Sequence, residues 1–263
     1  TEIETIWVGE TNRSWLYVRI HTDKGITGLG EAGLWGYPEA SEGVIKAFKR
    51  YLVGVDPLKI EHHWQFLYRN THFSGAAVMS ALSAIDVALW DIAGKCFEVP
   101  TCVLLGGKYR DKVRVYIHIS GDTTEQLAEN ALAMVREGFN AVRFTPFGPD
   151  YLRMRHSDIM KLAVERVRGV REAVGDKVDI ALEVGRKLTP IDAIILARDI
   201  ESFHPLFFED PIPPGSSDAM AWVASQVRIP LATGERLHTI WEFKDLLDKK
   251  AAHIIRPDAG VAG

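Results

Sequence analysis

Three glutamates stand at the ends of short apolar runs, where their side chains could hold a metal ion. Glu183 follows Ile-Ala-Leu, Glu209 follows Leu-Phe-Phe, and Glu235 follows Leu-Ala-Thr-Gly. Both intervals are 26 residues, the length of one strand and one helix, so in a parallel fold the three side chains converge at the ends of adjacent strands. Carboxylates gathered without a cation repel one another, whereas hard oxygen ligands suit Mg²⁺. The spacing therefore predicts a metal site; the alternative is that each glutamate is a solvated loop residue or a helix-start acid.

Two other acids near these glutamates give weaker signals. Asp258 ends a fourth such run, but it lies 23 residues after Glu235 and is equally consistent with a turn. Asp210 and Pro211, which follow Glu209, are expected to form a turn rather than to bind metal.

The chain from Lys112 onward alternates between predicted strands and amphipathic helices. Helix starts are indicated by Thr123-Thr-Glu-Gln126, by Ser157-Asp158 and by Thr189-Pro190, where threonine can cap the helix and proline takes its first position. Consecutive strand–helix units predict parallel strands joined by right-handed crossovers. The six strand candidates are residues 113–119, 141–145, 178–184, 206–209, 229–232 and 253–256.

Residues 1–111 have a different rhythm and are predicted to form a separate domain. Between residues 2 and 31 the chain reads as short strands, with Asp23-Lys-Gly25 as a hairpin turn. Apolar residues at helical spacing follow in 39–52, 57–70 and 76–96. We therefore expect an α+β domain over residues 1–111 and an α/β domain over residues 112–263.

Six parallel strands fit either an open doubly wound sheet or an incomplete barrel, because a closed barrel of this type needs eight. No GxGxxG, GxxxxGKS or GxxxxGKT sequence follows any of the predicted strands. The main nucleotide-binding signals of the open sheet are therefore missing.

The composition excludes several classes of function. With 31 basic and 35 acidic residues among 263 the net charge is −4, too balanced for a protein that binds nucleic acid or an anionic membrane. No run approaches the roughly 18 uncharged apolar residues of a membrane span, and the first residues lack signal-peptide features, so we expect a cytoplasmic protein. Cys96 and Cys102 form neither a CxxC pair nor a zinc set and are expected to be reduced packing residues.

Five segments carry a resemblance to a known family. They are Ser80-Ala-Leu-Ser-Ala-Ile-Asp-Val-Ala-Leu-Trp-Asp-Ile-Ala-Gly-Lys95, Leu104-Leu-Gly-Gly107, Phe208-Glu-Asp-Pro-Ile212, Ala232-Thr-Gly-Glu-Arg236 and Ile255-Arg-Pro-Asp258. In these segments the chain resembles the enolase superfamily, specifically the mandelate racemase/muconate lactonizing enzyme group and its galactonate and mannonate dehydratase type. The resemblance covers essentially the whole chain.

The resemblance implies a fold, a cofactor and a reaction. It implies an α+β capping domain followed by a modified TIM-like (β/α) barrel of seven parallel strands and one antiparallel strand, of which about six units are present here. It implies that Glu183, Glu209 and Glu235 bind Mg²⁺. It also implies that a base removes the proton next to the carboxylate of a sugar acid, that the metal stabilises the enediolate, and that water then leaves.

The same resemblance suggests residues that contact substrate. The loops 33–37 and 71–75 would belong to the cap, where connecting loops often carry binding residues. Trp35, Tyr37 and His72 are the candidates there, with interdomain packing as the alternative. Arg236, beside the third glutamate, is a further candidate.

The sequence departs from the family pattern at the proton acceptors. The positions of the family's Lys-x-Lys pair hold Arg143 and Thr145, and neither an arginine that stays protonated nor a threonine is a base. Gly185 stands where the dehydratase branch carries a histidine. Asp258 matches the aspartate of a His-Asp pair whose histidine would lie beyond Gly263.

Two histidines are candidate substitutes for the missing base, because imidazole titrates near neutral pH. His118 lies on the first predicted barrel strand, and His238 follows Glu235 by three residues.

Three hypotheses about function remain open. The first is a Mg²⁺-dependent acid-sugar dehydratase, with Asp258, Arg143, Thr145, His118 and His238 as the catalytic candidates. The second is a catalytically silent or fragmentary binding or assembly protein that kept the fold and lost the bases. The third is a racemase or cycloisomerase that shares the enolate step.

A barrel that ends after its sixth strand would leave strand edges and apolar helix faces exposed. We therefore expect a fragment of a longer protein, a homo-oligomer in which another subunit covers the open side, or a degenerate remnant. The expected partner is a small carboxylate of the sugar-acid class, with no nucleic acid and no membrane.

Overall fold

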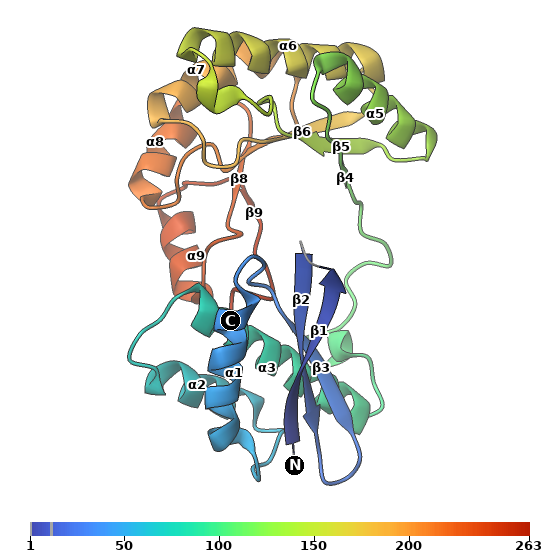
Figure 1. Cartoon of the computed structure of the whole chain (residues 1–263), viewed down its shortest axis with the longest axis vertical. Helices are drawn as coiled ribbons and strands as arrows, with labels where there is room; N and C mark the ends of the chain where they lie inside the picture. The colour runs from blue at the N-terminus through green and yellow to red at the C-terminus, as the bar shows by residue number, and fades with distance from the viewer. Residues whose placement is uncertain (1, 11–12) are drawn as a thin grey trace. The chain divides into compact units, whose positions relative to one another are not determined.

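The computed structural model describes residues 2–10 and 13–263. Contacts divide the chain into two compact units, which are described separately below. The first comprises residues 1–111, 234–243 and 257–263, and the second comprises residues 112–233 and 244–256. Figure 1 traces the chain through both units.

The first unit contains an antiparallel sheet and several helices. Within the described residues its strands are β1 (Glu2–Glu10), β2 (Arg13–His21) and β3 (Thr27–Ala32), paired in that order. The predicted turn is present, since Gly25 adopts φ +75° and its N–H donates to the Thr22 carbonyl. The helices are α1 (Pro38–Leu52), α2 (Ile60–Asn70), α3 (Ala76–Cys96) and α4 (Thr101–Leu104).

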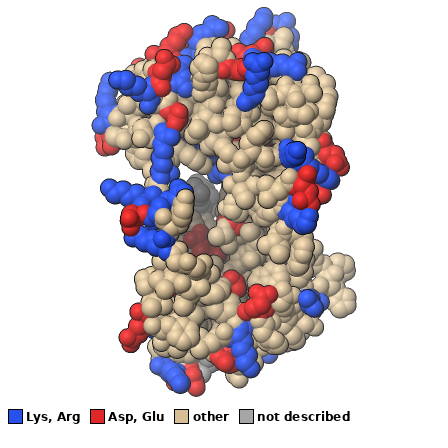
Figure 2. All heavy atoms as spheres, turned by 180° about the vertical axis from the view of Figure 1, so that it is seen from behind, with Lys and Arg blue, Asp and Glu red and all other residues tan. Residues whose placement is uncertain are grey.

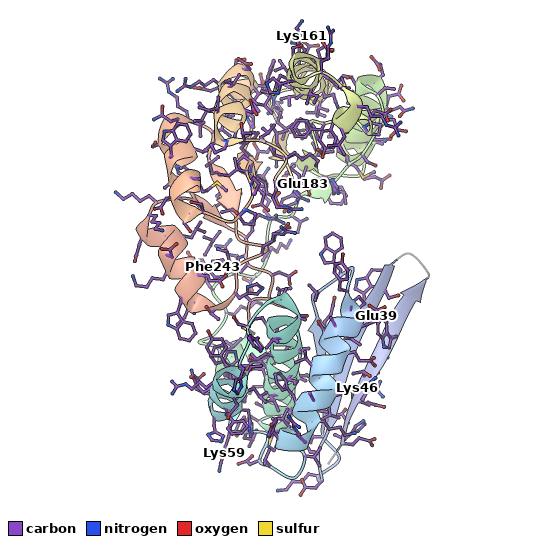
Figure 3. All side chains as sticks on the ribbon, turned by 60° about the vertical axis from the view of Figure 1, so that its left-hand side comes forward. Glu39, Lys46, Lys59, Lys161, Glu183 and Phe243 are labelled. Carbon is purple, nitrogen blue, oxygen red and sulfur yellow. The ribbon has the colours of Figure 1, made fainter. Side chains whose placement is uncertain are left out.

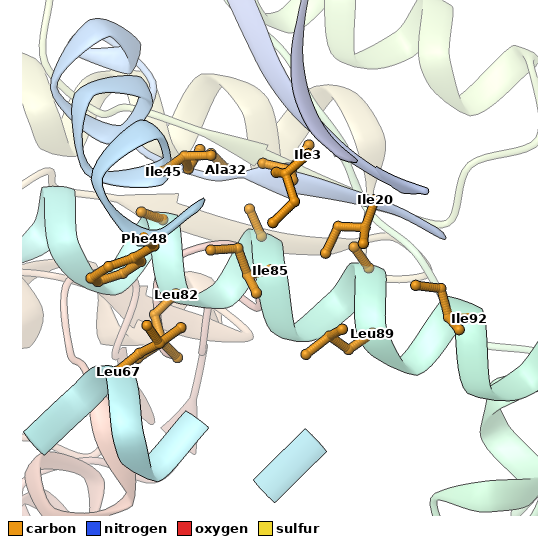
Figure 4. Packing of buried hydrophobic residues seen from close by; sticks show 14 of the residues in the cluster. Ile3, Ile20, Ala32, Ile45, Phe48, Leu67, Leu82, Ile85, Leu89 and Ile92 are labelled. Atoms are coloured by element: carbon orange, nitrogen blue, oxygen red, sulfur yellow. The ribbon is translucent and has the colours of Figure 1, made fainter. Parts of the chain in front are cut away.

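Helix α3 forms the core of this unit. Its backbone approaches β3 so closely that a Cβ at Gly28 would lie 2.0 Å from the Ala88 carbonyl oxygen, and one at Gly30 would lie 1.9 Å from that of Ala84. Leu82, Ile85, Leu89 and Ile92 are buried together with residues of the sheet and of α1, such as Ile3, Ile20, Ile45 and Phe48 (Figure 4). Among the described residues α3 is also the one helix long and apolar enough to span a membrane, but 61% of that window is buried inside the protein.

The second unit is built on a parallel sheet. Among the described residues its strands follow one another in chain order as β4 (Ile117–His118), β5 (Ala141–Phe144), β6 (Asp179–Glu183), β7 (Phe207–Glu209), β8 (Leu231–Thr233) and β9 (Ile254–Ile255). This sequential parallel order is the arrangement of an incomplete TIM-like barrel, which confirms the predicted fold class.

Helices connect these strands and cover one side of the sheet, as Figure 1 shows for α5 to α7. The connecting helices are α5 (Thr124–Arg136), η1 (Tyr151–Arg153), α6 (His156–Val174), α7 (Pro190–Ile200), η2 (Glu201–Phe203), α8 (Ser217–Gln226) and α9 (Thr239–Asp248). Thr123 and Thr189 cap α5 and α7 through their side chains, as predicted.

Three local predictions were wrong. The first barrel strand begins at Ile117 and not at Val113, because Val113 and Val115 are exposed and lie outside the sheet. Helix α6 starts at His156, so Ser157 lies within its first turn and is not its cap. Cys96 and Cys102 are free, as expected, but both are exposed and neither is a packing residue.

Acidic and basic side chains are interspersed over the face seen in Figure 2. This mixture matches the nearly balanced charge of the sequence. It offers no extended basic surface on that face for a polyanion.

Asp86, on α3, makes the stability of the first unit depend on pH. Burial, with a smaller contribution from the charge of Glu61, raises the pKa of the Asp86 carboxyl to about 6, while a hydrogen bond with Trp90 acts in the opposite direction. Because the folded-state pKa lies above the unfolded-state value, the ionised carboxyl destabilises the fold above pH 6, and this effect fades as the pH falls through 6 towards 4. We expect Asp86→Asn to increase the free energy of unfolding at pH 7.5 by about 1–2 kcal/mol, allowing for partial solvent screening.

Urea denaturation at pH 7.5 and pH 5.0 measures this effect. The gain should be smaller at pH 5.0, where the wild-type carboxyl is already protonated in the folded state. Asp91→Asn, which removes an acid of the same helix that pairs with Lys95, is the control and should bring no gain. An Asp86→Asn protein less stable than wild type at pH 7.5 would contradict the prediction.

Candidate functional site

Strands β6 and β7 place two of the predicted glutamates side by side. The two strands pair in parallel with Glu183 opposite Glu209, each at the last position of its strand. Parallel strands in register carry paired residues on the same face. In Figure 3 Glu183 lies at the sheet, whereas Lys161 lies on the outer side of α6. The 26-residue period therefore brings these two carboxylates to one edge of the sheet.

The guanidinium of Arg143 joins the two glutamates. Its Nε donates to Glu209 Oε2 at 2.5 Å and its Nη2 donates to Glu209 Oε1 at 2.9 Å, while Nη2 also lies 3.1 Å from Glu183 Oε2. The Arg143 side chain is 12% exposed and that of Glu209 only 1%. A bidentate arginine–carboxylate ion pair is among the strongest side-chain interactions. Arg143 thus acts as a charged clamp at the position where the family pattern led us to look for a base.

A second arginine contacts the same carboxylate. Arg256, the residue after β9, forms an ion pair through Nη1 with Glu209 Oε1. Glu209 is therefore a buried carboxylate neutralised by two guanidinium groups. Arg256 was not among the predicted site residues; the signal in the sequence is a basic residue at the end of a predicted strand.

Asp210 is a buried partner and not merely a turn residue. It adopts φ +41° and is 4% exposed. Its Oδ1 accepts a hydrogen bond from the Thr233 hydroxyl at 2.5 Å, and its Oδ2 lies 3.5 Å from Arg186 Nη1. Its two carboxylate oxygens thus link the ends of β7 and β8 with the loop after β6, which corrects the expectation of a simple turn.

His118 lies beside Glu183, and Thr145 follows the end of β5. His118 Nε2 is 3.6 Å from Glu183 Oε2. Burial lowers the pKa of His118, the Arg143 charge lowers it further, and the Glu183 charge raises it. The imidazole is therefore biased towards its neutral form. The Thr145 hydroxyl accepts a hydrogen bond from the Phe147 N–H at 3.5 Å and faces a cavity described below.

The remaining barrel candidates belong to segments grouped with the first unit. Glu235 lies two residues after β8 and is half-buried, and Arg236 beside it is exposed. His238 interacts with Glu242. Its backbone N–H donates to Glu242 Oε2 at 2.7 Å, and its ring Nδ1 lies 3.5 Å from the same oxygen. Asp258 Oδ1 accepts the Gly260 N–H at 2.8 Å, the geometry of the turn acid that the sequence left as an alternative.

The three cap candidates are all exposed. Trp35 is 69% exposed and Tyr37 71%, and His72 is exposed as well. Large apolar side chains on loops are common at binding surfaces but also occur singly without function. Substrate binding by these residues stays a prediction.

The carboxylates near Arg143 suit a hard divalent cation. Glu183 and Glu209 offer oxygen donors at the ends of adjacent strands, and their charge already attracts two guanidinium groups to the place where a cation would sit. Oxygen-rich, partly buried carboxylates are the ligands that Mg²⁺ prefers. The donor set fits Mg²⁺, on the condition that a guanidinium leaves Glu209 when the ion enters.

Two family models match the chain. The family "Enolase C-terminal domain-like" matches residues 126–263. The family "Mandelate racemase / muconate lactonizing enzyme, N-terminal domain" matches residues 6–106.

Known proteins match over nearly the whole chain. D-galactonate dehydratase of Variovorax paradoxus is 35% identical over 252 residues, which span 95% of this chain and 65% of that protein. The D-galactonate dehydratase of Ralstonia nicotianae is 35% identical over 251 residues with the same coverage. The chain thus spans about 65% of the length of the curated relatives that it matches.

Solved structures agree closely with the fold. A mandelate racemase/muconate lactonizing enzyme-like protein from a Roseovarius species superposes with a TM-score of 0.92 at 36% identity, covering 100% of this chain and 72% of that one. A member of the enolase superfamily from Salmonella Typhimurium gives a TM-score of 0.92 at 32% identity, covering 99% and 73%.

We expect the substitution of Arg143 to lower the stability of the fold strongly. Arg143→Met leaves Glu183 and the buried Glu209 without their shared partner, and removing one member of a buried ion pair typically lowers stability by about 3 kcal/mol or more. We expect a loss of about 3 kcal/mol in the free energy of unfolding at pH 7, slightly reduced because Arg256 still contacts Glu209.

The matched control is Arg153→Met, because Arg153 is 88% exposed and pairs only at 3.9 Å with Asp150. The control should change stability by less than about 0.5 kcal/mol. Equal effects of the two substitutions in chemical denaturation would show that the clamp contributes little.

Proposed function

The chain belongs to the mandelate racemase/muconate lactonizing enzyme family of enolase-like proteins, and from that premise we propose that it is a Mg²⁺-dependent dehydratase of sugar acids. The observation that carries the proposal is the pair of carboxylates at the ends of β6 and β7, Glu183 and Glu209, with basic side chains around them. The D-galactonate dehydratases among its relatives support the choice of substrate class.

The metal would be held by Glu183, Glu209 and Glu235, from the ends of three successive strands. When bound, Mg²⁺ would stabilise negative charge that develops on the substrate carboxylate as the neighbouring proton leaves. The regular spacing of the three glutamates and their oxygen chemistry support this assignment.

The arginines have two roles in this proposal. They neutralise Glu209, which would otherwise be a buried unpaired charge. With Mg²⁺ bound by that carboxylate, the Arg256 guanidinium would be available to bind the carboxylate of the acid, since its planar fork matches carboxylate geometry.

The second candidate function is a silent member of the family that binds a partner without catalysis. The observation that favours it is that the Glu209 carboxylate already forms ion pairs with Arg143 and Arg256. If neither guanidinium yields, the arginines are a permanent substitute for the metal and the site is structural.

We propose a small carboxylate of the sugar-acid class as the partner, a cytoplasmic location and a homo-oligomer. The interspersed surface charge seen in Figure 2 supports a small-molecule ligand over a polyanion. The location is supported by the relatives, which are dehydratases of a sugar acid.

Calorimetric titration with Mg²⁺ tests the metal site. We expect saturable binding by the wild-type protein and its loss in Glu209→Gln, because the amide removes the charged ligand. Arg256→Gln should bind Mg²⁺ about tenfold more tightly, since the ion no longer competes with that guanidinium for Glu209.

The control for this titration is Glu201→Gln, which changes an acid outside the site that pairs with Arg228 and should leave Mg²⁺ binding unchanged. Absence of Mg²⁺ binding by both the wild-type and the Arg256→Gln proteins would exclude the metal site. It would favour the second candidate function, a family member without catalysis.

Proton exchange tests the reaction class. Aldonic and aldaric acids incubated with the protein and Mg²⁺ in D₂O should exchange the proton next to the carboxylate and yield 2-keto acids by loss of water. Exchange with inversion but without 2-keto product would instead indicate a racemase. No exchange with any acid tested would contradict the enzyme proposal.

A further inference from the structure

The loop after β6 is held in a fixed conformation. The N–H groups of Val184, Arg186 and Leu188 donate in turn to the carbonyls of Glu209, Asp210 and Pro211, at 3.0, 2.6 and 3.2 Å. The hydrogen-bond ladder between β6 and β7 thus continues past the last residues of both strands. The backbone of this loop is therefore fixed next to the strand ends that carry Glu183 and Glu209.

One side chain of this loop, Lys187, occupies the space beside Gly185. Gly185 adopts φ +64°, and a Cβ built on it would lie 2.8 Å from Lys187 Nζ; the other atom within 4 Å is Lys187 Cε. Because position 185 has no side chain, the ammonium group can lie against the backbone of the loop. There it donates to the Val184 carbonyl at 3.4 Å.

Two aromatic rings also lie near this amine. Lys187 Nζ lies 5.6 Å from the ring centroids of both Phe147 and Tyr151, within the range of cation–π attraction. Lys187 as a whole residue is exposed, but the hydrogen bond that its Nζ donates is part-buried. The side chain of Lys187 is therefore partly open to solvent, while its amine is held by the Val184 carbonyl.

The amine faces a cavity at the carboxyl ends of three strands. The cavity measures about 260 Å³, and its lining includes Ser120 after β4, Thr145 after β5 and Lys187 after β6. Ligands of parallel α/β folds bind at this end of the strands. Lys187 thus lies beside a cavity at this end of the sheet that has room for a small ligand.

The surroundings of Lys187 lower its pKa from the ordinary value of a lysine. Burial lowers the pKa of Lys187, the Arg186 charge lowers it further, and the Glu183 charge raises it. The titratable and charged groups that face it from the loop, the strand end and the cavity are Glu183, Arg186, Tyr151, Asp122 and Arg166. A neutral amine is a proton acceptor, which neither Arg143 nor Thr145 can be.

We propose that Lys187 is a catalytic residue that removes the proton next to the substrate carboxylate and donates a proton to the leaving hydroxyl. The proposal rests on the proposed dehydratase function. It uses the position of the amine near Gly185, two aromatic rings and the cavity, and it supplies a proton acceptor where Arg143 and Thr145 are none. The signal in the sequence is a lysine four residues after Glu183, in the loop at a strand end.

The step balances without a further reactant. Lys187 Nζ, as the neutral amine, takes the proton from C2 of a 2,3-dihydroxy acid, and the electron pair of the C2–H bond moves towards the carboxylate. The protons of the ammonium group exchange with solvent. The C3–O bond then breaks, and the departing hydroxide takes a proton from the ammonium group and leaves as water. The enol product tautomerises to the 2-keto acid, and Lys187 is again a neutral amine.

The test compares Lys187→Met, Lys187→Arg and the control Lys161→Met, the last on the outer side of α6 (Figure 3). Each full-length protein is assayed for Mg²⁺ binding by calorimetry and for exchange of the C2 proton in D₂O with the acid that the wild type uses. We expect both Lys187 variants to lose exchange by at least about 100-fold while Mg²⁺ affinity stays within about twofold. Lys161→Met should match the wild type.

A pH profile separates proton transfer from a structural role. Exchange by the wild type should increase with pH as Lys187 loses its proton, at a pH below the ordinary lysine pKa of about 10.4. Lys187→Arg keeps a positive charge but has no neutral form in this range, so its profile should lack that rise. Gly185→Ala, which pushes a methyl group against Nζ, should also slow exchange without weakening Mg²⁺ binding.

The outcomes distinguish the two proposals. A wild type that exchanges the C2 proton, together with a Lys187→Met protein that exchanges it equally fast, overturns the role of Lys187 and leaves the dehydratase proposal standing. A wild type that binds Mg²⁺ but neither exchanges the C2 proton of any acid nor converts any acid to a 2-keto acid overturns both. Loss of exchange in Lys187→Met with normal Mg²⁺ binding supports the proposal.

Discussion

The contact of Arg143 with Glu183 and Glu209 is the interaction on which the rest of the site depends. It crosses three adjacent strands, since Arg143 lies on β5 and the glutamates end β6 and β7. Two acids at the ends of neighbouring parallel strands repel each other unless positive charge lies between them. The buried Glu209 makes that requirement strict, because a carboxylate with 1% exposure has almost no water to solvate it.

The same requirement links structure to function. Positive charge at this edge of the sheet can come from guanidinium groups or from a divalent ion, and Glu209 is the residue for which both would compete. Hydrogen bonds of the loop after β6 and of Asp210 with Thr233 hold the surrounding backbone. In the proposed function a cation would replace an arginine at Glu209, and that arginine would serve an anionic substrate, so the charges that stabilise the carboxylates would also serve the proposed reaction.

Sequence patterns predicted the fold better than the contacts within the site. The order of strands and helices, the caps at Thr123 and Thr189 and the proximity of Glu183 to Glu209 follow from periodicity and from parallel strands lying in chain order. Short edge segments were harder, because residues 113–116 alternate like a strand yet find no partner in the sheet. The contact of Arg256 with Glu209, the burial of Asp210 and the position of Lys187 depend on how far side chains reach across strands, which spacing along the chain does not encode. Lys187 needs in addition a glycine two residues earlier to leave it room.

Anomalous scattering from crystals grown with Mn²⁺, an ion that takes the same oxygen ligands as Mg²⁺, tests the central claim most directly. We expect an ion peak within coordination distance of oxygens of Glu183 and Glu209, with the Arg256 guanidinium moved away from Glu209. Crystals in which both guanidinium groups remain on Glu209 at saturating Mn²⁺, with no ion between the carboxylates, would contradict it.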